Sequence, residues 1–181
     1  MPGVYMVEQE TAQFESLVDG LVEAGLAPDT EALASVAQSL GKLFGVDPDE
    51  AAILKVVLKT KNLKFVIPEK LADVGSIPLS SATALAARTA REKRAEVVNN
   101  FSTSRHASVF EGVPLGRRQG EMIQKIMSAP ILEGIHVRGV VQISRKGYAP
   151  SDAGPDFTQK DLRTLTSLSP ALERFLKLCK A

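Results

Sequence analysis

The segment from residue 123 to residue 145 constrains the fold more than any other part of the chain. It carries two apolar runs, at about 123–132 and 136–145, with a short turn of sequence EGIH between them. β-Branched and apolar runs on both sides of a short glycine-containing turn predict two antiparallel strands. Pro130 lies inside the first run, and because proline donates no hydrogen bond to a neighbouring strand, it predicts a strand end or a bulge.

The remaining segments alternate between helical and strand patterns. Apolar residues at three- and four-residue spacing predict amphipathic helices at both chain ends and a second helix after the first. Short apolar and β-branched runs predict three further strands. The predicted helices lie at 9–24, at about 30–44, from Ser80 or Ser81 to Lys93, and from Phe157 toward the C-terminus as one element, and the predicted strands lie at about 51–58, 63–68 and 95–100.

The order of these elements predicts the fold class. Strands that pair in sequence order, with helices at both chain ends, are typical of an α+β domain whose antiparallel sheet of five to six strands is covered on one face by the terminal helices. The segment 99–118 mixes hydroxyl, aromatic and glycine residues, which predicts a long loop over the other face. We expect an N-terminal helix at 1–28, for packing or dimerisation, and the main domain at 29–181.

The composition excludes several classes of partner. Lysine and arginine number 22 and aspartate and glutamate 21, so no excess positive charge favours nucleic acid or anionic lipid. The basic cluster from Arg88 to Arg94 is interleaved with glutamates, which predicts a solvated face. No apolar run reaches the roughly 20 residues of a membrane span, and the first ten residues lack a signal-peptide pattern. We therefore expect a cytoplasmic protein that binds neither nucleic acid nor membrane.

Reactive side chains are few in the sequence. Cys179, the single cysteine, falls on the apolar stripe of the last helix, which predicts a buried and inert thiol. His106 and His136 have no carboxylate or thiol at metal-ligand spacing, so we expect no metal and no cofactor. No phosphate-binding loop or nucleophile motif occurs. We expect no enzymatic activity, and the alternative is an enzyme in which His106 acts as the acid or base.

Several segments resemble the GAF domain family of small-molecule sensor modules, and the similarity covers about residues 30–178. The hairpin at 126–147 matches the family's strand, turn, strand pattern, and the closing helix begins, as in the family, with a phenylalanine and an acidic residue. The matching residues are Pro130, Gly139, Gln142, Phe157, Asp161 and Leu162. The residues 81–87 depart from the family because they lack its usual glycines. The resemblance implies a GAF/PAS-like sheet with pocket-forming loops opposite the terminal helices.

The resemblance also implies a stand-alone sensor or regulatory domain that acts in signal transduction. An unidentified small molecule would lie between the sheet and the segment 99–118, where polar and aromatic side chains gather. The candidate ligand-binding residues are the amides Asn99 and Asn100, the aromatic Phe101 and Phe110, and the basic Arg105 and His106. Relatives with this fold that reduce methionine sulfoxide use several cysteines, whereas this chain has one.

Cyclic-nucleotide-binding members of the family carry a motif that this chain matches only in part. The corresponding residues are Arg145, Lys146, Phe157, Asp161 and Leu162, with the first and last members replaced. We expect Lys146 and Asp161 to form a structural ion pair that pins the intervening loop, worth roughly 0–1 kcal/mol if exposed.

The alternative to sensing is a ligand-free domain used for dimerisation. The N-terminal helix carries an apolar stripe from Phe14 to Val22, and family relatives dimerise through terminal helices, so we expect a homodimer. The output would pass through this dimer or a signalling partner protein. The competing interpretation is that the helix folds onto its own domain.

Overall fold

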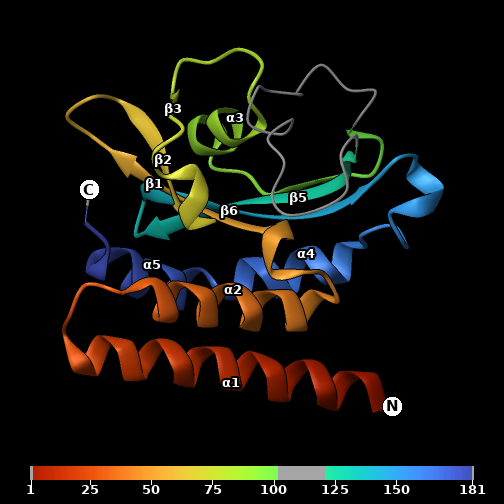
Figure 1. The fold of residues 1–181 in the computed structure, drawn as a ribbon, viewed down its shortest axis with the longest axis horizontal. Coiled ribbons are helices and arrows are strands. Elements are labelled where there is room, and N and C mark those ends of the chain that lie inside the picture. Colours follow the sequence, from red (N-terminus) through yellow and green to blue (C-terminus); the bar gives the residue numbers. More distant parts are fainter. Residues whose placement is uncertain (1, 102–120, 181) are drawn as a thin grey trace.

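The structure, a computed structural model, describes residues 2–101 and 121–180. Within these ranges the strands form one antiparallel sheet of six strands in the order β3-β2-β1-β6-β5-β4 (Figure 1). The strands are β1 (Ala51–Val57), β2 (Asn62–Ile67), β3 (Ser76–Pro78), β4 (Glu96–Val98), β5 (Met122–Glu133) and β6 (His136–Gly147). The predicted hairpin is confirmed as β5–β6, and the predicted α+β fold class is confirmed with it.

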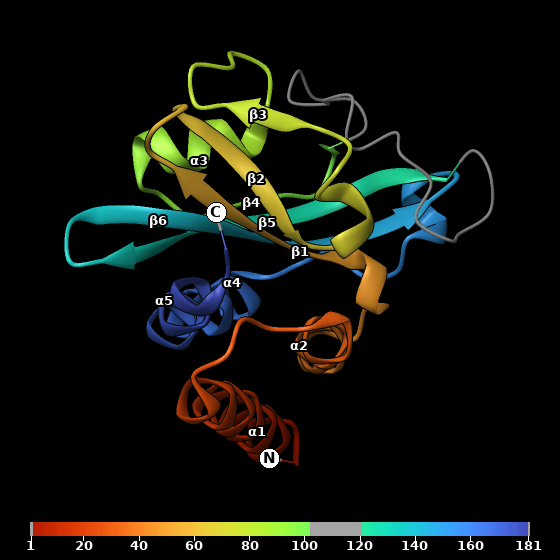
Figure 2. The same ribbon diagram turned by 60° about the vertical axis from the view of Figure 1, so that its left-hand side comes forward.

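Helices from both chain ends form two layers on one face of the sheet. The helices α2 (Thr30–Phe44), α4 (Gln159–Ser167) and α5 (Ser169–Leu178) lie against the strands, and α1 (Pro2–Ala24) lies outside them, against α2 and α5 (Figures 1 and 2). Phe14 and Val18 of α1 are fully buried within this chain. Leu17 and Leu21 pack against the same core, whereas Val22 at the end of the stripe is 37% exposed. The chain itself therefore covers most of this stripe, which favours the interpretation that the helix folds onto its own domain.

The ends of α2 follow from the local sequence. The Asp29 carboxylate accepts a hydrogen bond from the Ala32 N–H at 2.8 Å, which caps the first turn. Gly45 ends the helix in the left-handed conformation with φ of 66°, where a residue without a Cβ is favoured. This geometry sets α2 close to the start of β1 through the short 3₁₀ turn Pro48–Glu50.

The helix α3 (Leu85–Glu92) lies on the opposite face of the sheet (Figure 2). Its buried residues, which include Ala86 and Ala87, pack against β1, β2 and β6 in a second apolar cluster. The Ser81 hydroxyl accepts a hydrogen bond from the Ala84 N–H at 3.1 Å, just before the helix begins. The two faces of the sheet are thus covered by different parts of the chain.

Alternate residues of the central strands face these two layers. In β6, Val141 and Ile143 are buried in the cluster that contains the terminal helices, whereas Gln142 and Ser144 line a cavity on the α3 side. This follows from the period of two along a strand. We call these the helix face and the cavity face of the sheet.

Several predicted elements differ from the structure. The N-terminal helix begins at Pro2 and not at residue 9, and the third helix begins at Leu85 and not at Ser80 or Ser81. The last helix was predicted to be continuous, but it is divided into α4 and α5 at Leu168, because Pro170 in the first turn of α5 cannot continue a preceding helix. The short strand β3 falls in a segment where no strand was predicted, since three residues are too few for a periodic pattern. None of the helices in the described ranges is long and apolar enough to cross a bilayer.

Pro130 occupies the position that its chemistry predicts. It lies in β5 opposite Val140 of β6, and the pairing of β5 with β4 on the other side ends at Ser128. The register between β5 and β6 shifts between Ile131 and Leu132. The predicted irregularity therefore begins one residue after the proline, and Pro130 itself lies inside β5, beyond the stretch that pairs with β4.

Candidate functional site

The cavity face carries a partly open cavity of about 40 Å³. Ala52 of β1 and Gln142 and Ser144 of β6 contribute the polar and small side chains of the sheet, whereas Phe65 and Ile126 contribute apolar walls. Because a buried water needs roughly 10–15 Å³ of such space, the cavity has room for about three waters. A mostly apolar cavity with a few polar groups is the usual form of a small-molecule site.

A chain of hydrogen bonds holds the amide of Gln142 in place. Its Nε2 donates to the Ser128 hydroxyl at 3.2 Å, and that hydroxyl lies 2.7 Å from the Thr89 hydroxyl of α3. Thr89 in turn donates to the Leu85 carbonyl at 2.9 Å. Thr89 and Ser128 are fully buried. The chain therefore links β6 to β5 and β5 to α3 beside the cavity.

A buried carboxyl lies at one end of the cavity. Glu50 accepts hydrogen bonds from the Lys146 N–H at 2.6 Å and from the Asp47 N–H at 3.0 Å. Burial raises the pKa of the Glu50 carboxyl, while the hydrogen bond from the Lys146 backbone and the Lys146 charge act in the opposite direction. The Ser144 hydroxyl donates to the Glu50 carbonyl at 3.3 Å. Glu50 thus joins the start of β1 to the end of β6.

The candidate residue Asn99 has structural partners. Its Nδ2 donates to the Phe157 carbonyl at 3.0 Å, and its Oδ1 accepts from the Phe157 N–H at 2.9 Å. Both ends of the amide are therefore used to hold the segment before α4 against the end of β4. Asn99 is not among the described residues that line the cavity.

The other candidates in this segment have separate positions. Phe101 is fully buried and packs with Leu85, Ile123 and Ile126, so it supports the cavity wall. Asn100 is exposed. Arg105, His106 and Phe110 lie outside the described residues.

The structure gives Lys146 and Asp161 different contacts from the ion pair predicted between them. The Asp161 carboxylate accepts from the Thr158 N–H at 2.8 Å, and the Thr158 hydroxyl accepts from the Asp161 N–H at 3.1 Å. This capping box starts α4, so the local backbone takes up the carboxylate. Lys146 lines the cavity beside Glu50, and the ion pairs among the described residues do not join it to Asp161.

The neighbouring motif residues Arg145 and Phe157 lie on the helix face. The Arg145 guanidinium donates to the carbonyls of Phe44 and Gly45, at 3.1 and 3.2 Å, and lies 4.7 Å from the centre of the Phe157 ring. These contacts fasten the end of α2 to the segment before α4. The partial match to the cyclic-nucleotide motif thus coincides with structural contacts outside the cavity.

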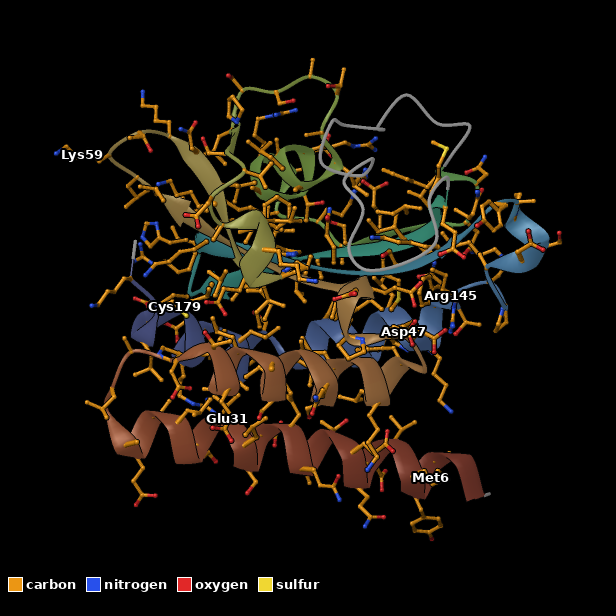
Figure 3. All side chains as sticks on the ribbon, in the orientation of Figure 1. Met6, Glu31, Asp47, Lys59, Arg145 and Cys179 are labelled. Atoms are coloured by element: carbon orange, nitrogen blue, oxygen red, sulfur yellow. The ribbon has the colours of Figure 1, made fainter. Side chains whose placement is uncertain are left out.

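Cys179, at the end of α5, lies far from Arg145. Figure 3 shows Cys179 and Arg145 at opposite ends of the molecule. The thiol is buried, and burial raises its pKa to about 11. The prediction of a buried thiol is confirmed, and a raised pKa keeps it in the unreactive protonated form at neutral pH.

The basic cluster before β4 makes contacts within the chain. Arg88 pairs with Glu92 and Glu96 at 3.5 and 3.4 Å, and Arg91 donates to the carbonyls of Leu79 and Ser81. Among the residues described, no group of three or more histidine, cysteine and acidic side chains is placed to hold a metal ion.

Sequence reasoning missed Glu50, Ser128 and Ser144 as residues of the site. The signal was the alternation in β6, where Gln142 and Ser144 separate apolar residues that fill the helix face. Ser128 alternates in the same way in β5. Glu50 carried no such signal, because its burial depends on the pairing of β1 with β6.

Solved structures share this fold at low sequence identity. The GAF domain of an Acinetobacter phosphoenolpyruvate-protein phosphotransferase matches with a TM-score of 0.66 and 13% identity, over 95% of this chain and 93% of that chain. The free methionine-R-sulfoxide reductase of Neisseria meningitidis, in complex with its substrate, matches with a TM-score of 0.64 and 16% identity, over 95% and 89%. The nlh2 GAF domain of A. aeolicus, in an inactive state, matches with a TM-score of 0.59 and 16% identity, over 95% and 98%.

These likenesses show the fold, and the family is shown by the sequence itself. None of the curated proteins matches the sequence. The family model described as the GAF domain matches residues 30–174, which leaves out α1 and the last residues of α5. The chain therefore belongs to the GAF domain family, as the resemblance of its C-terminal hairpin and closing helix implied.

Proposed function

We propose that this protein is a sensor or regulatory module that binds a small molecule in the cavity on the cavity face of its sheet. The observation that carries the proposal is the cavity of about 40 Å³ between β1, β6 and α3. Polar groups of Gln142, Ser144 and Glu50 meet there against apolar walls. Membership of a family of sensor modules supports the same function.

The size of the cavity limits the part of a ligand that it receives. Room for about three waters corresponds to three or four non-hydrogen atoms. Because the best small ligands gain at most about 1.5 kcal/mol per non-hydrogen atom, a ligand this small would bind in the micromolar range at best, and more commonly in the millimolar range. A larger ligand requires the walls to move apart.

Filling the cavity tests the proposal. Ala52 lines the cavity from β1, so Ala52→Leu places a larger side chain in the space that the ligand would occupy. Ala82→Leu serves as the matched control, because Ala82 is exposed in the segment before α3. A thermal-shift screen of nucleotides and metabolites, followed by native mass spectrometry, should identify a compound class that stabilises the wild type and Ala82→Leu but not Ala52→Leu. Equal stabilisation of all three proteins would contradict the proposed site.

Four of the six candidate residues in segment 99–118 remain part of the proposal. We propose that Asn100, Arg105, His106 and Phe110 contact the ligand. Asn99 and Phe101 are better explained as supports, because Asn99 holds Phe157 and Phe101 packs behind the cavity wall. Single alanine variants should weaken binding of the compound found in the screen when they replace Asn100, Arg105, His106 or Phe110.

A homodimer or a partner protein is the proposed route of output. Tyr5 and Met6, on the first turns of α1, are 73% and 60% exposed, and Leu26 after this helix is 74% exposed. These side chains offer apolar surface that the chain itself does not cover. Light scattering would test the dimer, and a mass near 19 kDa that does not change with concentration would contradict it.

The alternative of an enzyme has less support than a sensor. The Neisseria relative is a reductase, but the one cysteine of this chain is Cys179, on the helix side of the sheet with a raised pKa. Its thiol is not among the described groups that line the cavity. We therefore propose binding without catalysis.

A further inference from the structure

The hydrogen bonds behind the cavity have a direction. The Thr89 hydroxyl lies 2.9 Å from the Leu85 carbonyl oxygen. Because a carbonyl oxygen only accepts, the hydroxyl donates its proton to that oxygen. Ser128 must then donate its own proton to Thr89, across 2.7 Å. The Ser128 oxygen is left as an acceptor, and the Gln142 Nε2 donates to it at 3.2 Å.

This direction fixes which end of the Gln142 amide is available to a ligand. The NH₂ group is turned toward Ser128, and the carbonyl oxygen Oε1 has no hydrogen-bond partner within the described part of the chain. Gln142 lines the cavity. The amide therefore presents its carbonyl oxygen, a hydrogen-bond acceptor, to the cavity, while its NH₂ group is bonded to Ser128.

The other polar groups of the cavity point to the same preference. The Ser144 hydroxyl donates its proton to the Glu50 carbonyl, so the Ser144 oxygen can only accept a hydrogen bond from a ligand. The charged side chains among the described lining residues are Asp49, Glu50 and Lys146, two acids and one base. The described part of the lining therefore carries no excess of positive charge that would favour an anion.

We propose that this cavity selects a ligand that presents N–H donors, as an amidine, a guanidine or a primary amine does, and discriminates against carboxylates. The inference rests on the proposed function, because it concerns the ligand of the same cavity. Its structural origin is the chain from Leu85 through Thr89 and Ser128, which sets the orientation of the Gln142 amide.

Two probes of equal size and opposite hydrogen-bonding character test the proposal. Acetamidinium and acetate each have a planar end and four non-hydrogen atoms, which suits a space of about 40 Å³. Acetamidinium only donates, whereas acetate only accepts. The full chain, labelled with ¹⁵N, is titrated with each probe up to about 100 mM at constant ionic strength, since ligands this small bind weakly. The dissociation constants are read from the side-chain amide signals of Gln142.

We expect acetamidinium to bind the wild type at least about tenfold more tightly than acetate, because an acetate oxygen would face an unpaired acceptor. Thr89→Val distinguishes the effect of the amide orientation from the effect of the charged lining residues. It removes the acceptor of the Ser128 proton without changing any charge, so Ser128 donates to the Gln142 carbonyl and the amide presents its NH₂ group to the cavity. The preference for acetamidinium should then fall at least about fivefold or reverse.

Ser128→Ala provides a second variant in case Thr89→Val does not fold. Alanine removes the partner that orients the amide, so the preference should again decrease. A wild type that binds acetate as well as acetamidinium would overturn the inference and leave the proposed function standing. A preference that is unchanged in a folded variant would overturn it as well, because charge alone would then explain the selection. Binding of neither probe would contradict both the inference and the cavity as a ligand site.

Discussion

The two faces of the sheet are built from alternate residues of the same strands, but they differ in chemistry. On the helix face, Met127, Val141 and Ile143 are at most 1% exposed and pack against the terminal helices. On the cavity face, Ser128, Gln142 and Ser144 occupy the intervening positions, and Gln142 and Ser144 line the cavity. The apolar core under the terminal helices and the proposed binding site therefore lie on opposite sides of one sheet, and a shift of register by a single residue would exchange the side chains of the two faces.

Charged side chains on the helix face serve a structural purpose. Lys55 donates to the carbonyls of Leu176 and Cys179 at the end of α5, at 3.0 and 2.5 Å. Lys125 donates to the Gly154 carbonyl at 2.7 Å and pairs with Asp156 at 2.8 Å. These charges fasten loops and helix ends to the strands. On the cavity face, the Gln142 amide and the hydroxyls of Ser128 and Thr89 bond to one another. Glu50 and Ser144 bond to backbone groups there.

Met127 and Ser128 offer the sharpest test of this difference, because they are adjacent, fully buried and on opposite faces. Met127→Ala should lower the free energy of unfolding by about 2–5 kcal/mol, since it leaves a void in the main core. Ser128→Ala removes two side-chain hydrogen bonds and should cost about 1–2 kcal/mol. Urea denaturation measures both values. Equal losses would show that the two faces contribute alike to stability.

Asn99 tests whether a residue predicted to bind ligand is structural instead. Asn99→Ala leaves the Phe157 N–H and carbonyl without their partners, so the free energy of unfolding should fall by about 1–3 kcal/mol. Gln159→Ala in the first turn of α4 is the control, because a substitution at an exposed site should change stability by less than about 0.5 kcal/mol. If Asn99→Ala keeps full stability but loses ligand binding, the ligand-binding interpretation is correct.

Cys179 should make the free energy of unfolding decrease at alkaline pH. Burial raises the pKa of its thiol in the folded protein to about 11, above its ordinary value near 9. The folded state therefore favours the protonated thiol, and this contribution is fully present below about pH 9 and is lost as the pH rises toward 11. The loss should reach up to roughly 2 kcal/mol between pH 8 and pH 10.5. The same pH series on Cys179→Ala should lack this component, and parallel curves for the two proteins would contradict it.

The sequence predicts most of the fold because its elements are set by local pattern. The helices and the β5–β6 hairpin follow from apolar periodicity, and Pro130 marks the irregularity next to it. Gly139 is explained only by the packed structure, where a Cβ would collide with the Leu54 carbonyl oxygen and lie 2.6 Å from a Leu176 methyl group. A close approach between segments so distant in the chain leaves no local signal.

The candidate site was predicted less completely than the fold. The sequence placed the candidate pocket on the face opposite the terminal helices, where the structure has a cavity, but it favoured the long segment, where Asn99 has structural partners. Glu50 and Ser144 come together only through the pairing of β1 with β6. The direction of the Gln142 amide depends on Thr89, which reaches it through the packing of α3 on β5. Contacts of this kind are set by tertiary structure.

Isoleucine side chains on both faces allow the central claim to be tested in one experiment. Ile77, Ile123 and Ile126 line the cavity, whereas Ile53, Ile131 and Ile143 belong to the helix-face core. The protein is labelled at isoleucine methyl groups and titrated with the compound that gives the largest thermal shift. The NMR signals of the first three methyl groups should move with a common dissociation constant, while the last three stay nearly unchanged. Movement confined to the helix-face methyl groups, or saturation without any change at the cavity, would contradict it.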